Sequence, residues 1–269
     1  MKIIAINGSP RGCRGNTYRM LDAMREGVLK TFAEMEIINL SEIVMHMCIG
    51  CFRCWDKAEP NEIKCILKDD VESVFREMLD CNLWIFASPV YYDNVSAYMK
   101  IFMERMVMFH NPEIKSYGNI YAHDIAFNIP PIVMLASCDL PGHNNFDIIS
   151  LLMKKIALNL NTELIEEIYQ SEARILTWPL DSLQILASCR RKLWIKAGCE
   201  LALQGKLSDR LKTRLNSLSM SFTLGKFRFL SRNSLFLQVT QIFSFLSFFI
   251  KYHLTKYAKC AAAFVSDEF

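Results

Sequence analysis

The sequence lacks the motifs that mark several common classes of protein. Neither GxGxxG nor GxxxxGK[ST] occurs in it, which excludes the two most common glycine-rich nucleotide loops. No Ser–His–Asp or Cys–His pairing stands out, so no side chain is assigned as a catalytic nucleophile or base. The formal net charge is only +3, from 31 basic and 28 acidic residues, and residues 1–207 alone carry about −3. We therefore expect no nucleic-acid binding by this part of the chain.

We also expect no leader sequence for secretion. The chain begins directly with an apolar strand pattern, without the charged region and cleavage site of a signal peptide. The 10 cysteines then indicate free thiols or metal ligands in a reducing compartment, and not a disulfide framework. We expect a cytoplasmic protein, and the apolar content of 52% is ample for a folded core.

The first stretch, MKIIAINGSPRGCRGNT, predicts a strand, a glycine-rich loop and the start of a helix. The first N–H groups of a helix have no partner within it and its dipole favours negative charge, so this stretch predicts an anion site. The alternative is a plain strand–turn–helix in which Asn16 is the N-cap. The side chains that add donors or positive charge are Ser9, Arg11, Arg14, Asn16 and Thr17.

Five apolar strand patterns alternate with five helical patterns over residues 1–205. The strands are expected at 2–7, 35–40, 83–87, 132–136 and 163–169, and the helices at 16–33, 69–81, 95–109, 146–160 and 179–205. Such alternation predicts an α/β fold with a doubly wound parallel sheet, because βαβ crossovers bury both faces of the sheet. Ligands bind beyond the carboxyl ends of such strands, where we expect the loops 8–16, 88–94 and 137–144 to meet.

Two motifs about 80 residues apart, GSPRGCRGNT and SPVYYDNVSAYMKIFMER, resemble the flavodoxin-like NAD(P)H-dependent FMN reductases over roughly residues 1–205. The resemblance implies a three-layer sandwich with a five-stranded parallel sheet in the order 2-1-3-4-5. It also implies FMN as cofactor, NAD(P)H as possible electron donor, and a homodimer or homotetramer.

The resemblance further implies which residues hold FMN. The phosphate would be held by Ser9, Arg11, Asn16 and Thr17, and the isoalloxazine ring would be flanked by Pro89, Val90, Tyr91 and Tyr92. The family usually has a Gly-rich turn in the third loop; the chain has SCDLPG there, which offers Ser137, Cys138 and Asp139. Ordinary aromatic packing at a strand end is the alternative for Tyr91 and Tyr92.

Four cysteines, Cys48, Cys51, Cys54 and Cys65, form the pattern C-x2-C-x2-C with one remote cysteine, which is typical of cysteine ligation to a [4Fe–4S] cluster. The motif resembles that of the iron–sulfur flavoproteins, although ten residues separate Cys54 from Cys65 where those proteins have a shorter gap. A longer loop costs little closure entropy, about 0.6 kcal/mol per doubling of its length. The alternatives are buried structural thiols and a redox-active dithiol or zinc site.

The segment 110–131, with its prolines and with His110 and His123, is expected to be an irregular connector that covers the substrate or contacts a subunit. From residue 208 to the end, nine basic residues stand against three acidic ones, and we expect a basic and apolar helical extension separate from the domain 1–207. Its uncharged stretch 233–250 is expected to pack on the body or a partner; peripheral membrane contact and a true span are the alternatives.

Together these features predict an FMN-dependent oxidoreductase, with a [4Fe–4S] cluster in the Cys-rich loop 47–65. Electrons would come from a reduced nicotinamide or a ferredoxin-type donor and go to a small molecule or a protein, and the flavin itself would carry the chemistry. One alternative is a plain NAD(P)H:FMN or quinone reductase with structural cysteines. The other is a flavodoxin-like electron carrier without turnover of its own.

Overall fold

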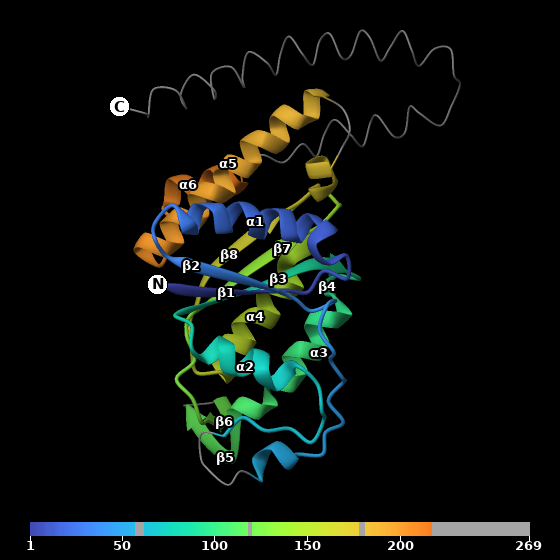
Figure 1. The fold of residues 1–269 in the computed structure, drawn as a ribbon, viewed down its shortest axis with the longest axis vertical. Helices are drawn as coiled ribbons and strands as arrows, with labels where there is room; N and C mark the ends of the chain where they lie inside the picture. The colour runs from blue at the N-terminus through green and yellow to red at the C-terminus, as the bar shows by residue number, and fades with distance from the viewer. Residues whose placement is uncertain (57–61, 118–119, 178–180, 217–269) are drawn as a thin grey trace, which may run out of the picture. The chain divides into compact units, whose positions relative to one another are not determined.

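The computed structural model describes residues 1–56, 62–117, 120–177 and 181–216, all within a compact unit that spans Met1–Ser219. Its sheet has six strands, one more than predicted: five parallel strands and a short antiparallel one, β4 (Asn94–Val95), beside β3 (Figure 1). The parallel strands are β1 (Lys2–Asn7), β2 (Glu34–Asn39), β3 (Leu83–Tyr91), β7 (Ile132–Ser137) and β8 (Leu164–Gln170). Their spatial order is β2-β1-β3-β7-β8, which confirms the predicted order 2-1-3-4-5 of the parallel strands.

Six helices cover the two faces of the sheet within the described residues. They are α1 (Asn16–Leu29), α2 (Val71–Leu79), α3 (Ala97–Arg105), α4 (Asp147–Asn159), α5 (Asp181–Gln204) and α6 (Asp209–Asn216). One hydrophobic core joins α2, α3 and α4 to side chains such as Ile4 and Ile6. The other joins α1, α5 and α6 to Ile3 and Ala5. Alternate residues of one buried strand thus serve both cores, as expected for a doubly wound sheet.

The segment 110–131 is not irregular, and this prediction was wrong. It forms an antiparallel hairpin of β5 (His110–Tyr117) and β6 (Ile120–Ile125), which lies beyond α2 from the sheet in Figure 1. The register of this hairpin shifts between His110 and Ile114, where Pro112 has no N–H to donate to a partner strand. A proline in the strand therefore hid its regular pattern.

The predicted loop 88–94 also contains extended structure. β3 continues through Tyr91 and turns back into β4 (Asn94–Val95), which pairs with it in antiparallel fashion. Tyr92 and Asp93, the two residues of the turn, have φ values of 52° and 61°. Two positive φ values are the signature of a type I′ hairpin turn, which usually holds Asn or Gly.

The described chain continues past the predicted domain end at residue 207. Leu207, Leu211 and Leu215 are buried in the core that α1 and α5 share, so α6 packs on the body of the protein. The predicted stretch 233–250 lies outside the described residues. Among the helices that the structure describes, none combines the length and apolarity needed to cross a membrane.

Candidate functional site

Three loops meet at the carboxyl edge of the sheet. The loop after β1 is tied to β3 by a hydrogen bond from Gly8 N to Ala87 O of 2.7 Å. Thr17, at the start of α1, and Ser137, at the end of β7, lie within hydrogen-bond distance, with 2.9 Å between their hydroxyl oxygens. The predicted convergence of the strand ends is therefore present in the fold.

The first loop is tightly built around Ser9, whose side chain is buried. Its backbone N–H donates to Asn7 Oδ1, and its hydroxyl accepts the N–H of Arg11 at 3.3 Å. A Cβ atom at Gly15 would lie only 2.5 Å from Ser9 Oγ, so the chain can approach here only because residue 15 is glycine. The result is a compact backbone cradle in front of α1.

The N-terminus of α1 is open to a ligand. Its N-cap is Gly15, and no side chain caps the helix, so the interpretation of Asn16 as the N-cap is wrong. Asn16 is the first helical residue, and its Oδ1 atom is buried with no hydrogen-bond partner in the described part of the chain. The exposed Arg11 guanidinium approaches Arg14 O, which keeps positive charge beside this helix end. Unpaired helical N–H groups and basic side chains together suit an anion.

The second loop presents aromatic side chains. Pro89 and Val90 are partly buried, Tyr91 is about half exposed, and Tyr92 is fully exposed at the tip of the β3–β4 turn. An aromatic residue in the left-handed region stores strain, and such strain is often found at binding sites. Because no described residue covers the Tyr92 ring, core packing does not explain this side chain.

The residues of the third loop have two kinds of contact: one faces the site and the others bind neighbouring parts of the fold. Ser137 faces the site through its contact with Thr17. The backbone of Cys138 instead bonds to Gln170 O and Ala173 N, and burial raises the pKa of its thiol. The Asp139 carboxylate pairs with Arg174 at 3.0 Å. Cys138 and Asp139 thus have structural partners next to the site.

Ser96 is a site residue that we did not predict. Its hydroxyl accepts the N–H of Met99 as the N-cap of α3, and it donates to Gly8 O at 2.5 Å. Its N–H donates to Ser88 Oγ, so it joins the first and second loops. A serine directly before a helical pattern was the available signal.

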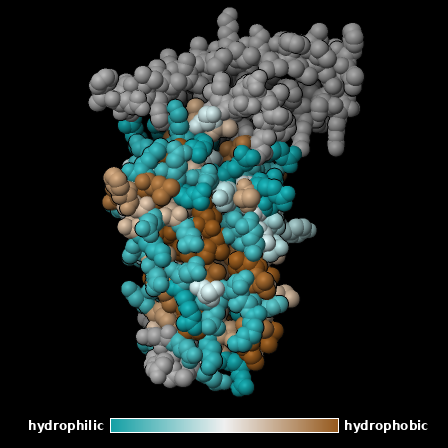
Figure 2. Space-filling view, in the orientation of Figure 1, coloured by the Kyte–Doolittle hydropathy of each residue, from teal (hydrophilic) through white to brown (hydrophobic). Residues whose placement is uncertain are grey.

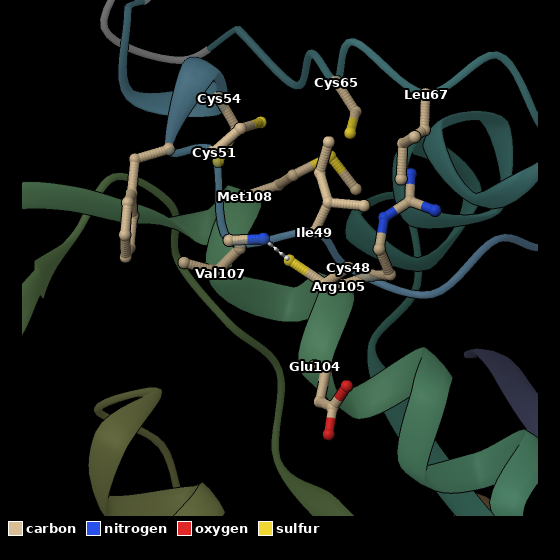
Figure 3. Close-up of a pocket in the computed structure, with 12 residues that line it drawn as sticks. Cys48, Ile49, Cys51, Cys54, Cys65, Leu67, Glu104, Arg105, Val107 and Met108 are labelled. Atoms are coloured by element: carbon tan, nitrogen blue, oxygen red, sulfur yellow. Dashed lines mark hydrogen bonds between the residues drawn. The ribbon is translucent and has the colours of Figure 1, made fainter.

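One cavity of about 320 Å³ is lined by the three cysteines of the C-x2-C-x2-C motif and by the remote Cys65 (Figure 3). Cys54 is buried, Cys48 and Cys65 are partly buried, and Cys51 is exposed. The cavity is completed by residues of the Cys-rich loop and of the end of α3, including Ile49, Leu67, Arg105 and Met108. The long gap before Cys65 therefore does not prevent its return to the other three.

The electrostatics of Cys54 reflect this convergence. Burial raises the pKa of its thiol because it disfavours the thiolate, and the charges of Cys65, Cys48 and Cys51 raise it further. Four thiols that line one cavity repel one another as thiolates, so a positive group among them would be stabilised. Within the described residues, no group of three or more His, Cys, Asp or Glu side chains is arranged so that it could hold a metal ion.

Hydrogen bonds pin both ends of the Cys-rich loop together. Val44 N donates to Asp70 Oδ2 at 2.7 Å, and Asp70 N donates back to Val44 O. His46 N donates to Asp69 Oδ2 at 2.9 Å. Inside the loop, Gly50 and Phe52 adopt positive φ values of 64° and 53°, which turn the backbone around the cavity.

Exposed hydrophobic side chains surround this loop: Val44, Met47, Ile49, Phe52 and Ile66. Figure 2 shows hydrophobic atoms gathered in the middle and lower part of one face, within a mostly hydrophilic surface. Apolar surface of this kind is common at binding sites.

Comparison with known proteins finds similarity in sequence over the first part of the chain and similarity in fold over most of it. Residues 1–122 match the family described as NADPH-dependent FMN reductase. An iron-sulfur flavoprotein of Archaeoglobus fulgidus is 38% identical over 120 residues, which are 44% of this chain and 52% of that protein. One from Methanocaldococcus jannaschii is 35% identical over 105 residues, 39% of this chain and 51% of that protein. The chain thus matches about half the length of these curated relatives.

Solved structures support the fold. An FMN-dependent NADH-azoreductase from Bacillus anthracis in complex with FMN has a TM-score of 0.52 at 16% identity, over 75% of this chain and 99% of that one. An NAD(P)H:quinone oxidoreductase from Methanothermobacter marburgensis has a TM-score of 0.52 at 14% identity, over 75% and 96%. At such low identity these similarities establish the flavodoxin-like architecture alone.

Proposed function

We propose that the protein is an FMN-dependent oxidoreductase, from the premise that residues 1–122 match the family described as NADPH-dependent FMN reductase. The observation that carries the proposal is the uncapped N-terminus of α1 behind the Gly15 cradle, at the edge where three loops meet. A phosphate needs N–H donors and positive charge, and this helix end has both.

The chain's own residues would bind and orient the cofactor. The phosphate would be bound by Ser9, Arg11, Asn16 and Thr17. The ring would be flanked by Pro89, Val90, Tyr91 and Tyr92. Ser137 lies beside Thr17. We keep Cys138 and Asp139 as supports of the third loop. When bound, FMN supplies the electron-transfer chemistry, and for this reason no side chain is assigned a catalytic step.

We further propose that Cys48, Cys51, Cys54 and Cys65 hold a [4Fe–4S] cluster. Their spacing, their shared cavity and the names of the archaeal relatives support it. A single Zn²⁺ ion holds its sulfur ligands only about 2.3 Å from one centre, and a cavity of about 320 Å³ offers more room than that. A cluster at this position would supply one-electron transfer.

Two measurements separate the alternatives. A protein purified anaerobically with a cluster should absorb broadly in the visible range and contain about four irons per chain. Flavin absorption without iron would favour a plain reductase with structural cysteines. Steady-state oxidation of NADH and NADPH with a quinone or ferric acceptor tests turnover, and tight FMN binding without turnover would favour an electron carrier.

We also propose an electron donor and an oligomeric state for the protein. We expect a reduced nicotinamide or a ferredoxin-type donor, a homodimer or homotetramer, and a cytoplasmic location. Stopped-flow reduction of the bound flavin with each donor ranks the donors, and light scattering gives the oligomeric state.

Arg11→Ala is expected to weaken FMN binding roughly tenfold, because a charge-assisted contact to the phosphate contributes about 1.5 kcal/mol. Riboflavin, which has no phosphate, should bind the variant and the wild type equally. Fluorescence titration of the apoprotein with each flavin measures both affinities.

The matched control is Lys30→Ala, which removes one positive charge from the opposite end of α1, where Lys30 pairs with Glu26 on the surface. This variant should bind FMN as the wild type does. An equal loss of FMN and riboflavin affinity in Arg11→Ala would contradict a phosphate site at this helix end.

A further inference from the structure

We propose that Arg105 is the positioning residue of the cysteine site. It is a buried cation that lines the same cavity as the four cysteines, and its partner Asp69 closes the loop that carries them. The inference rests on the proposed cluster at this site. It adds to that proposal the residue that would stabilise the negative charge held by four thiolates.

The first observation is the burial of the pair. Arg105 lies at the end of α3 and is only 1% exposed, and the Asp69 side chain is fully buried. The guanidinium contacts both carboxylate oxygens, with Nη1–Oδ2 at 2.5 Å and Nη2–Oδ1 at 3.2 Å. Buried ion pairs of this kind are often no more stabilising than apolar side chains of similar volume, so fold stability alone does not explain them.

The second observation is the link to the ends of the Cys-rich loop. Arg105 Nη1 also donates to His46 O at 3.0 Å, and Asp69 accepts from His46 N and Val71 N. Since His46 precedes Cys48 and Asp69 follows Cys65, one ion pair holds both ends of the segment that carries the four thiols.

The third observation is an unused donor. Arg105 Nε is buried and has no hydrogen-bond partner among the described residues, although the side chain lines the cavity with the cysteines (Figure 3). Asp69 is not among the residues that line the cavity, so the pair presents its positive end there.

A buried donor without a partner is costly, and it is expected to find an acceptor in the functional state. Sulfur carrying negative charge is the acceptor that this cavity offers. Hydrogen bonds and positive charge near cluster sulfurs favour the reduced, more negative state and raise the reduction potential. Glu104 also lines the cavity, but its carboxylate pairs with Lys100 on the surface.

Three variants test the inference: Arg105→Lys, the double variant Asp69→Asn with Arg105→Met, and the control Lys100→Met. The control removes a cation from the surface of the same helix. Each is reconstituted anaerobically with iron and sulfide, and iron content, the cluster midpoint potential and the thermal midpoint of the apoprotein are measured. We expect full loading and an unchanged potential for Lys100→Met. The potential should become more negative in Arg105→Lys and more negative still in the double variant, in which loading also falls.

The outcomes are distinct. In one outcome the thermal midpoint of the apoprotein falls, but the loaded variants keep the wild-type midpoint potential. The pair is then merely structural, and the inference is overturned. Wild-type protein that takes up no iron overturns the proposed cluster, and with it the charge that Arg105 is inferred to stabilise. If the wild type loads iron but the variants have an unchanged midpoint potential, the proposed cluster is supported and the role of Arg105 is contradicted.

Discussion

We expect Cys54→Ala to abolish iron incorporation, which is the largest expected effect on the proposed cofactors. Cys54 is the buried member of the cysteine group, and the other three thiols all contribute to its raised pKa. Without it, three thiols remain around a cavity of about 320 Å³, one fewer than the four cysteines that would hold a [4Fe–4S] cluster. Iron analysis after gel filtration should give about four irons for the wild type and below about one for the variant.

The matched control is Cys81→Ala. Cys81 is also buried, and burial also raises the pKa of its thiol, but it lies beyond the end of α2, where Sγ contacts Glu77 O. Both variants lose one buried sulfur, so a shared loss of stability cancels between them. Equal iron content in the two variants would contradict the cluster and would favour structural thiols.

The strands could be predicted because their chemistry is local. KIIAIN, LWIFASPVY and IVMLAS contain uninterrupted apolar runs, and each is buried on both faces of the sheet. A short apolar run of this kind is typical of a strand buried on both faces of a sheet. The alternation of such strands with helices then predicts a parallel sheet with βαβ connections. The hairpin of β5 and β6 has a broken register and residues that are exposed or only partly buried, and no local pattern marked it.

The proposed site was predictable to the extent that it is carried by short motifs. The first loop, the aromatic turn and the cysteines are each continuous in sequence, and the fold brings the cysteines to one cavity. The pair of Arg105 and Asp69 could not be found in this way, because the partners are 36 positions apart in the sequence and meet only in the folded state. The same holds for Ser96, which bonds to Gly8 across the sheet edge.

The crossing of α1 and α5 is a second feature that only the fold reveals. The two helices approach so closely that a Cβ atom on Gly27 would lie 1.8 Å from Ile195 O, and one on Gly198 would lie 2.0 Å from Met24 O. Cys199 Sγ contacts Gly27 O at 3.1 Å in the same crossing. Because the obstructing atoms are backbone atoms, a rotamer change cannot relieve the clash.

Gly198→Ala is therefore expected to destabilise the protein by about 3 kcal/mol, toward the upper end of the usual cost of overpacking. Helix propensity alone predicts the opposite sign, a gain of about 1 kcal/mol for alanine over glycine, so the direction of the change decides between the two. Urea unfolding followed by circular dichroism measures it. Cys189→Ala, at an exposed position of the same helix, should stay within about 0.5 kcal/mol of the wild type. A Gly198→Ala protein as stable as that control would show that α1 and α5 do not cross at these glycines, and the core that joins them to Ile3 and Ala5 would have to be packed differently.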